Sequence, residues 1–298
     1  MISICIPIYN FNVSPLLDEL SMQMEKAEAS VELILIDDCS SSEYKERNKS
    51  VCNKHRYIEL EENIGRAKIR NLFLNHAQYE HLLFLDCDSL IPNKTFLSNY
   101  LKTIKEGQNS IICGGRIYDS AKPDSNKLLR WKYGIEKESL SYEERMQQPN
   151  KSFMTNNFLI SKQLLQEIKF DERLSEYGHE DTLFGFELKK RGIEINHIEN
   201  PVLNGHLENN AEYLKKTEKS IHNLIAILDY VNYDPDFIQD VSLLNFYSNP
   251  STKKLIPFIK IFFPFLKPFI KFFLINGFIS IRLFSFYKFG ILIQEMKS

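Results

Sequence analysis

Two glycine patterns that bind phosphate groups in proteins are missing from this chain. It contains neither G-x-G-x-x-G nor G-x-x-x-x-G-K-[ST], which argues against a dinucleotide-dependent oxidoreductase and against a P-loop kinase. A diphosphate bound without such a glycine cradle must have its charge met by a cation and by side chains.

Cysteine is scarce, and the cysteines are not spaced as pairs. The five cysteines are an odd number, and none of them forms a C-x-x-C pair. They are expected to be buried thiols in a reducing compartment and to form neither a disulfide framework nor a zinc site. Met1 runs almost directly into an apolar strand, so we expect no signal peptide and a cytoplasmic protein.

Acidic residues are almost absent from the last part of the chain. Residues 241–298 carry eight Lys and Arg against one acid, Glu295, a charge of +7 that leaves −9 on residues 1–240. An acidic body argues against nucleic acid as a partner, and a basic, apolar tail indicates an anionic membrane surface.

The chain also lacks a long apolar run. The longest uncharged apolar stretch, 272–281, falls well short of the roughly 20 residues that span a bilayer. Residues 253–293 hold 11 of the 22 phenylalanines, and four basic residues share one helical face: Lys260, Lys267, Lys271 and Arg282. This pattern predicts an amphipathic helical tail over 231–298 that lies on the membrane surface through 253–293, broken or kinked at three prolines: Pro257, Pro264 and Pro268. The alternative is a helix pair packed on its own domain or on a second subunit, which would make the protein an oligomer through the tail.

What is present is a regular alternation of strands and helices. Apolar strands are expected at 2–8, 31–36, 57–60 and 81–85, with helices at 65–77, 92–106 and from Ser14, where Ser caps and Pro15 takes the first helical position. The alternation predicts an α/β fold with a mostly parallel sheet and helices on both faces. Residues 119–152 are polar and aperiodic and are expected to form a long loop.

Polar residues follow four of these strands. The tripeptide Asp86-Cys87-Asp88 ends the strand 81–85, and Asp37-Asp38 ends the strand 31–36. Since parallel strands emerge at one edge of a sheet, these acids would converge there with Tyr9 and Arg66. Two interpretations stay open for each acidic pair: an Asp-rich turn that caps the next helix, or a nucleotide-diphosphate site with a divalent cation.

The ordered motifs resemble a family 2 glycosyltransferase of GT-A fold. The resemblance covers roughly residues 1–225, and its motifs in the first half are 2–10, 36–40, 63–65 with Arg70-Asn71, and 84–88. The second half adds 155–158, 170–172, and 177–185, which is similar to the "W-G-G-E-D" acceptor segment of chondroitin-polymerase-like and galactosyltransferase-like members. Residues 204–209 resemble the family's downstream metal-binding His segment.

The resemblance implies a role for particular residues. The uracil and ribose of a UDP-sugar would be held by Pro7, Tyr9, Asp38 and Arg70, and Asp86 would contact the ribose or donor sugar. Asp88 and His206 would ligate Mn²⁺ or Mg²⁺, with diphosphate oxygens completing the shell. A loop histidine without a role remains the alternative for His206.

The same resemblance implies where the acceptor binds. Asp181 would be the general base that removes the proton of the acceptor hydroxyl, with inversion at the anomeric carbon, and the acceptor site would include Glu180, Tyr177 and Asn157. An acidic pair at a helix start also favours the helix dipole, which is the structural alternative. Tyr177 and His179 stand where the family segment often has Trp and Gly, so acceptor identity is not implied.

The sequence therefore predicts a metal-dependent enzyme that transfers a sugar from a nucleotide-sugar to a glycan or lipid-linked acceptor in cell-surface polysaccharide synthesis. The expected domains are 1–230, with a nucleotide-binding half at 1–118 and an acceptor-binding half at 119–230, and the tail 231–298. The protein would be peripheral on the inner face of the cell membrane. A sugar nucleotidyltransferase of related fold and a non-catalytic membrane-associated scaffold are the alternative functions.

Overall fold

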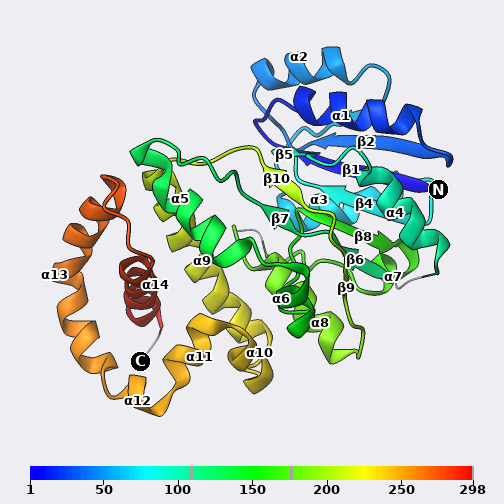
Figure 1. The fold of residues 1–298 in the computed structure, drawn as a ribbon. Helices are drawn as coiled ribbons and strands as arrows, with labels where there is room; N and C mark the ends of the chain where they lie inside the picture. Colours follow the sequence, from blue (N-terminus) through cyan, green and yellow to red (C-terminus); the bar gives the residue numbers. More distant parts are fainter. Residues whose placement is uncertain (108–109, 175–176, 297–298) are drawn as a thin grey trace. The chain divides into compact units, whose positions relative to one another are not determined.

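The computed structural model describes residues 1–107, 110–174 and 177–296. The chain forms two compact units (Figure 1). Unit 1 comprises Met1–Asp119, Ser139–Ser175 and Phe184–His206, and unit 2 comprises Ser120–Glu138, Glu176–Leu183 and Leu207–Ser298. The boundaries between the two units do not coincide with the change of amino-acid composition near residue 230. The helix that ends there, Asn210–Tyr230, belongs to the same unit as the tail that follows it.

Unit 1 is built on a seven-stranded sheet of order β3-β2-β1-β4-β8-β6-β9. Its strands are β1 (Ile2–Ile8), β2 (Val31–Asp37), β3 (Arg56–Glu59), β4 (His81–Leu85), β6 (Ile111–Cys113), β8 (Asn157–Ser161) and β9 (Asn196–His197). β8 is antiparallel to both of its neighbours, β4 and β6, and the other pairs are parallel. The predicted α/β fold with a mostly parallel sheet is confirmed.

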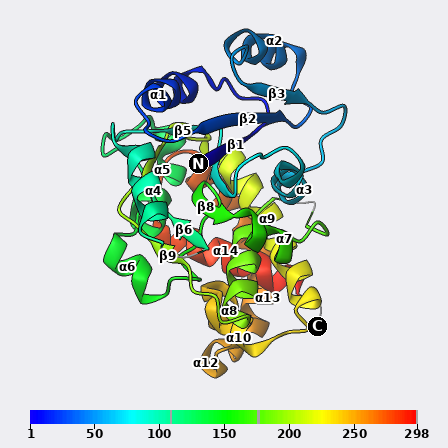
Figure 2. The same ribbon diagram turned by 90° about the vertical axis from the view of Figure 1, so that its right-hand side faces the viewer.

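Helices cover both faces of this sheet (Figure 2). On one face, apolar residues of α1 (Ser14–Glu25) and α4 (Phe96–Lys105) join the core formed by alternate residues of β1, β2 and β4. On the other face, the core includes residues of α3 (Arg66–Leu72), α7 (Lys162–Glu167) and α8 (Glu180–Lys190). The remaining helices of this unit are α2 (Ser42–Val51) and α6 (Tyr142–Gln147), and a 3₁₀ turn, Phe73–Asn75, follows α3. Burial on both faces explains why β1 is apolar at nearly every position.

A second, three-stranded sheet extends unit 1. β10 (Val202–Asn204) pairs antiparallel with β5 (Ser89–Leu90) and parallel with β7 (Arg116–Ile117). This small sheet joins the segment after β4 to the segment that ends in His206, which lie far apart in the sequence.

Two local expectations were wrong. The cap position of α1 is Val13 rather than Ser14, so the helix starts one residue earlier than predicted, and the Asn12 side chain accepts from the Ser14 backbone N–H at 3.2 Å. The stretch 119–152 is not a plain loop, because it contains the 3₁₀ turn Ser125–Lys127, α5 (Leu128–Tyr133), a π-helical turn at Gly134–Glu138 and α6. These elements are too short to show periodicity in the sequence.

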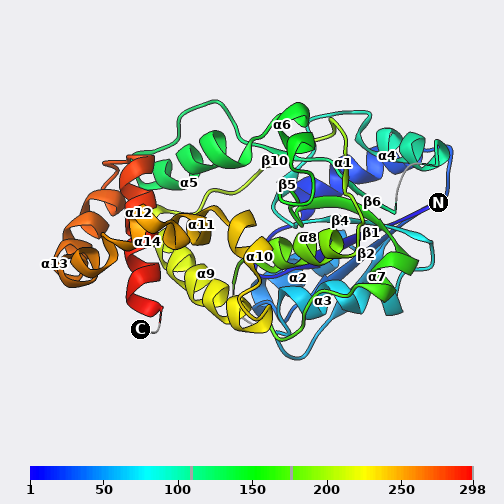
Figure 3. The ribbon, with the colours of Figure 1, turned by 90° about the horizontal axis from the view of Figure 1, so that it is seen from below.

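Unit 2 is helical around α9 (Asn210–Tyr230). The tail that follows forms α10 (Pro235–Asp240), α11 (Ser242–Ser248), α12 (Pro250–Lys253), α13 (Ile256–Ile275) and α14 (Ile281–Glu295). The expected break is absent from the middle of the tail, because α13 continues as a helix through Pro264 and Pro268. α13 and α14 lie side by side (Figure 3). Within the described ranges, none of the helices combines the length and the apolarity needed to cross a bilayer.

Candidate functional site

The carboxyl ends of β1 and β2 are held together by polar side chains. The backbone N–H of Asn10 donates to the Ser40 hydroxyl at 2.8 Å, and the Asn10 side chain accepts from the Ser41 N–H at 2.8 Å. These bonds fix the backbone beside Tyr9, whose ring is 54% exposed. Pro7 lies within β1, half-buried, in register with Ile36. An exposed ring beside a fixed backbone can stack on a planar ligand.

The two acids that end β2 have different surroundings. Asp37 is fully buried and accepts from the Ser40 N–H at 2.7 Å and the Tyr57 hydroxyl at 3.1 Å. The Asp38 carboxylate accepts the backbone N–H groups of Ile64 at 2.7 Å and Gly65 at 3.1 Å. Burial raises the pKa of Asp38, and these two N–H groups oppose that shift. Asp38 therefore holds the loop that leads into α3.

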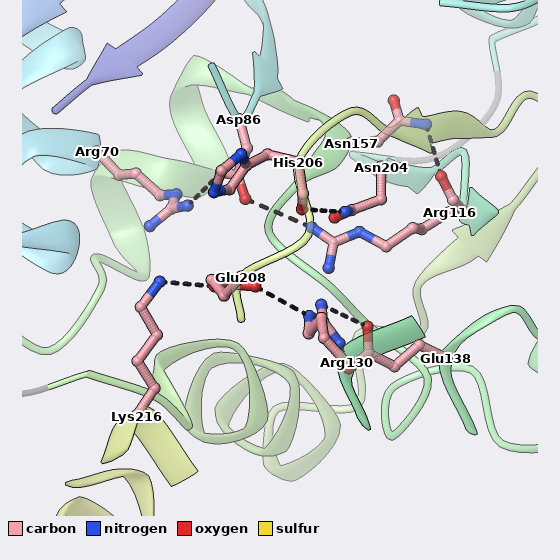
Figure 4. A network of polar contacts seen from close by, with 11 residues as sticks. Arg70, Asp86, Arg116, Arg130, Glu138, Asn157, Asn204, His206, Glu208 and Lys216 are labelled. Carbon is pink, nitrogen blue, oxygen red and sulfur yellow. Dashed lines mark hydrogen bonds and ion pairs between the residues drawn. The ribbon is translucent and has the colours of Figure 1, made fainter. Parts of the chain in front are cut away.

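Asp86 lies between two guanidinium groups (Figure 4). Its Oδ1 is 3.0 Å from Nη2 of Arg70, and its Oδ2 is 3.7 Å from Nη2 of Arg116. Burial alone would raise the pKa of this carboxyl, but the charges of Arg70, Arg66 and Arg116 outweigh it, and the pKa lies below its ordinary value. Asp86 is therefore ionised, with three arginines close to it.

Arg116 was missed by the sequence reasoning. It stands in β7, directly after a Gly-Gly pair, and nothing in the sequence connects it to Asp86. Asn156 was also not singled out, although its buried side-chain amide has neither atom in a hydrogen bond and its backbone carbonyl accepts from the Asp86 N–H at 3.1 Å.

Two of the sequence motifs contact each other through Asn71. Its amide donates to the Phe170 carbonyl at 2.9 Å and to Oε1 of Glu172 at 2.9 Å, and its oxygen accepts from the Phe170 N–H at 3.0 Å. This side chain fixes the end of α3 against residues 170–172, which places Arg70 on a rigid support.

Asp88 and His206 lie on adjacent segments of the small sheet. The pairing of Asn204 with Ser89 continues into a bond from the Gly205 N–H to the Asp88 carbonyl at 2.9 Å. A Cβ at position 205 would lie 2.6 Å from that carbonyl oxygen, so this approach requires glycine. The exposed His206 ring packs edge-on against Phe11, with centroids 5.8 Å apart.

A metal ion here would have few protein ligands. In the part of the chain that is described, no three His, Cys, Asp or Glu side chains form a group that could hold a metal. One carboxylate and one imidazole, Asp88 and His206, remain a donor set that suits Mn²⁺ when other oxygens complete the shell. The residues therefore fit a cation that is shared with a bound phosphate.

Asn157 was expected in the acceptor site, but its side-chain amide makes all of its hydrogen bonds inside unit 1. It is completely buried, accepts from the Tyr100 hydroxyl at 2.7 Å, and donates to the carbonyls of Gly115 at 3.0 Å and Asn200 at 2.9 Å. The Asn157 side chain thus holds the backbone that follows β6, at Gly115 directly before Arg116, and the backbone that follows β9, at Asn200.

In unit 2, a strained loop precedes Glu180 and Asp181. Gly178 and His179 both have positive φ, of 98° and 67°, and the Gly178 carbonyl accepts from the Asn223 amide of α9. Burial lowers the pKa of His179 to about 4, although the nearby Glu180 carboxylate acts to raise it. The His179 ring is therefore neutral at pH 7. Positive φ at a non-glycine residue is costly and persists where the surroundings impose it.

The acidic pair takes the first turn of α8. Glu180 is buried, and Asp181 is half-buried with its Oδ1 accepting from the Thr182 N–H at 2.7 Å. The Tyr177 ring faces the ammonium of Lys216, which lies 5.4 Å from the ring centroid. The loop thus presents an aromatic ring and two acids on one short segment.

A second ion-pair cluster in unit 2 was not predicted from the sequence. Arg130 donates to both oxygens of Glu138, at 2.8 and 3.0 Å, and its Nε is 3.4 Å from Glu208, which also pairs with Lys216 at 2.6 Å (Figure 4). Burial raises the pKa of Glu208, but Lys216 and Arg130 outweigh it and lower the pKa. Arg130 and Glu138 come from the stretch that the sequence left without a pattern.

Comparisons with known proteins agree with the resemblance. A model of the family described as glycosyl transferase family 2 matches residues 3–168. Chondroitin synthase of Pasteurella multocida (strain Pm70) is 26% identical over 229 residues, which are 64% of this chain but only 23% of that protein. The chain thus spans about a quarter of the length of this relative.

Solved structures share the fold. TarS of S. aureus, as its segment 1–349, is 19% identical, covers 98% of this chain and 88% of its own, and has a TM-score of 0.56; the same segment is also known in complex with UDP-GlcNAc. The mannosyltransferase PcManGT of Pyrobaculum calidifontis, in complex with GDP-Man and Mn²⁺, is 14% identical, covers 98% of this chain and 85% of its own, and has a TM-score of 0.60.

Proposed function

Because the chain belongs to glycosyl transferase family 2, we propose that it transfers a sugar from a nucleotide-sugar, a UDP-sugar in the first place, to a hydroxyl of a glycan or lipid-linked acceptor. The observation that supports this best is the pairing of β5 with β10, which sets Asp88 beside the segment of His206. Likeness to a chondroitin synthase and to a protein solved with UDP-GlcNAc supports a role in cell-surface polysaccharide synthesis.

The donor would bind at the carboxyl edge of the sheet. Tyr9 offers an exposed ring for the uracil, with Pro7 and Asp38 beside it, and Arg70 holds Asp86 for a contact with the ribose or donor sugar. The arginines close to Asp86, which are Arg66, Arg70 and Arg116, are the side chains that bind phosphate oxygens well. In this assignment residues 1–118 bind the nucleotide, and residues 119–230 bind the acceptor.

Asp88 and His206 would hold Mn²⁺ or Mg²⁺. A bound ion of this kind would act as a Lewis acid that neutralises the diphosphate of the donor. Relatives of the same fold support a divalent cation, since PcManGT was solved with Mn²⁺. The carboxylate and imidazole of this chain would hold that ion, and Gly205 allows the segments of Asp88 and His206 to approach each other closely.

Asp181 would be the general base of the transfer. Its carboxylate takes the proton of the acceptor hydroxyl as that oxygen forms a bond to the anomeric carbon. The bond from that carbon to the diphosphate oxygen breaks, and the nucleoside diphosphate leaves with the electron pair, which inverts the configuration. Glu180 and Tyr177 would contact the acceptor sugar. Asn157 is assigned to positioning, because its amide is already bonded on all sides.

The experiment that tests this proposal replaces Asp181. Asp181→Asn keeps the size of the side chain but removes the base, so sugar transfer should fall by about a hundredfold or more, while the affinity for UDP stays within about twofold. Asp18→Asn, an exposed carboxylate of α1, is the matched control and should keep full transfer. Full activity of the Asp181 variant would disprove the assignment of the base.

A further inference from the structure

The outward face of α13 exposes a continuous row of large apolar side chains. Of the twenty large apolar residues that are exposed in the described chain, ten lie between Leu255 and Phe278. On α13 they are Phe258, Ile261, Phe262, Phe265, Leu266, Phe269, Phe272 and Phe273, and Phe265 is 70% exposed. A soluble surface rarely leaves so many neighbouring aromatic rings in water, so this face indicates a contact with something apolar.

The opposite face of α13 is already packed on its own unit. Phe263, Ile270 and Leu274 are buried there, and the Phe263 ring lies against α14, where a Cβ on Gly290 would come within 2.2 Å of it. Lys271 pairs with Glu218 of α9 at 3.3 Å. These contacts fix the helix with its phenylalanine row pointing outward. If α13 rotated about its axis to bury that row, Phe263, Ile270 and Leu274 would become exposed.

The shape of this face fits a surface rather than a pocket. A helix of 20 residues is about 30 Å long, and the exposed rings recur along all of it, at Phe258, Phe265, Phe269 and Phe272. None of the described helices is able to cross a bilayer. A helix that cannot span a bilayer but carries a long apolar stripe on one side is typical of helices that lie in the plane of the membrane interface.

Charge decides between a lipid surface and a second copy of the chain. Residues 241–298 carry eight basic residues and a single acid, Glu295, and Lys253 and Lys254 are exposed directly before α13. A symmetric dimer through this face would bring two strongly basic tails together. Anionic headgroups meet that charge directly, at about 1 kcal/mol for each basic residue near the surface.

We propose that α13 is the membrane-contact element of this protein, with its phenylalanine row set into the headgroup and acyl boundary of an anionic bilayer and the basic charge of the tail attracted to the phosphates. The inference rests on the proposed transfer to a glycan or lipid-linked acceptor and names the surface that would bring the enzyme to a membrane. Vesicle binding is measurable without turnover, so its failure is distinguishable from failure of the transfer reaction.

The test uses the full chain and flotation with phosphatidylcholine vesicles, with or without phosphatidylglycerol. The wild type should float with the anionic vesicles and weakly or not at all with the neutral ones, and the double variant Phe265→Glu/Phe269→Glu should bind at least about tenfold more weakly. Met22→Glu is the matched control, because Met22 is also an exposed apolar residue but lies on α1. It should float like the wild type, and circular dichroism shows whether each variant is folded.

A second measurement separates insertion from surface adsorption. The chain has a single tryptophan, Trp131, so Phe265→Trp in a Trp131→Phe background reports from the proposed face alone. Its emission should shift to the blue and be quenched by brominated lipid when anionic vesicles are added. The proposal is overturned if the wild type does not bind anionic vesicles, if the double variant binds as tightly as the control, or if the emission of the Phe265→Trp variant does not change. It is also overturned if the wild type is a dimer that Phe265→Glu/Phe269→Glu dissociates, because the face would then be covered by a second copy.

Discussion

The Arg70 side chain is only 2% exposed, and its guanidinium contacts two polar groups and one aromatic ring of unit 1. It donates to Asp86 at 3.0 Å and to the Arg66 carbonyl at 3.2 Å, and its guanidinium lies 5.8 Å from the centroid of the Phe170 ring. A buried charge of this kind is tolerated only with its partner in place, because an unpaired ion in the interior is strongly destabilising.

Replacing Arg70 should therefore cost stability as well as donor binding. Arg70→Met leaves the Asp86 carboxylate with the charges of Arg66 and of Arg116, whose Nη2 lies 3.7 Å away. We expect a loss of about 3 kcal/mol in the free energy of unfolding by urea at pH 7. Arg173→Met removes an arginine whose side chain is 62% exposed and which pairs with Asp171. That control should change stability by less than about 0.5 kcal/mol.

The stability difference between wild type and Arg70→Met should depend on pH in a defined direction. The folded-state pKa of Asp86 lies below its ordinary value, so its ionised form contributes stability above the unfolded pKa of about 3.9 and loses that contribution as pH falls through the folded pKa. The difference should thus be largest near neutral pH and shrink in acid. A difference that grows below pH 4 would contradict the assigned charge state.

Single residues also show how far the sequence could lead. Asp88 and His206 were paired from the resemblance, and the backbone bond between Gly205 and Asp88 brings their segments together. Arg116 could not be found in this way, because its contact with Asp86 depends on the pairing of β7 with β10, which is only two residues long. Short pairings of this kind leave no periodic pattern in the sequence.

At the scale of elements, the loop before α8 depends on close packing against α9. Gly178 has a φ of 98°, and a Cβ on it would lie 2.6 Å from the Cβ of Ser220. Asn223 of α9 donates to its carbonyl. The backbone that leads into Glu180 and Asp181 is thus fixed by a neighbouring helix, which is the support that a precisely placed base requires.

Gly178→Ala should impair transfer without impairing donor binding. The added methyl group must displace the loop or α9, so we expect transfer to fall by about tenfold or more and the affinity for UDP to stay within about twofold. Gly192→Ala is the matched control, because Gly192 also has a positive φ, of 70°, but a Cβ there would meet nothing within 4 Å. Equal losses in both variants would show that backbone strain, rather than contact with α9, explains the effect.

Elements also differ in how well the sequence foretold them. The strands 2–8 and 81–85 were predicted to the residue, because buried strands are continuous apolar runs. Of the three prolines expected to break or kink the tail, Pro257 stands in the first turn of α13, whereas Pro264 and Pro268 do not break that helix. Local propensity was overridden by tertiary packing of Phe263, Ile270 and Leu274.

At the scale of the whole molecule, the sequence and the structure divide the chain differently. Composition changes near residue 230, and the motifs run on in one order to residue 209. In the structure each compact unit is built from segments that are not continuous in the sequence, since 120–138 and 176–183 belong with the helical tail. Contacts between distant segments decide this division, and composition carries no information about them. The α/β class followed from the alternation of strands and helices, which survives in unit 1.

The central claim is tested most directly by measuring the release of nucleoside diphosphate from a panel of UDP-, GDP- and dTDP-sugars. The measurement is made with and without Mn²⁺ or Mg²⁺ and compares the wild type with Asp88→Asn and His206→Ala. We predict that the wild type releases UDP from a UDP-sugar only when Mn²⁺ or Mg²⁺ is present. Each variant should lose at least about tenfold of that activity, whereas His222→Ala, a half-exposed histidine of α9, should retain it. Release that is independent of metal, or undiminished in both site variants, would contradict the proposed metal and diphosphate site, and no release from any donor would contradict the proposed function.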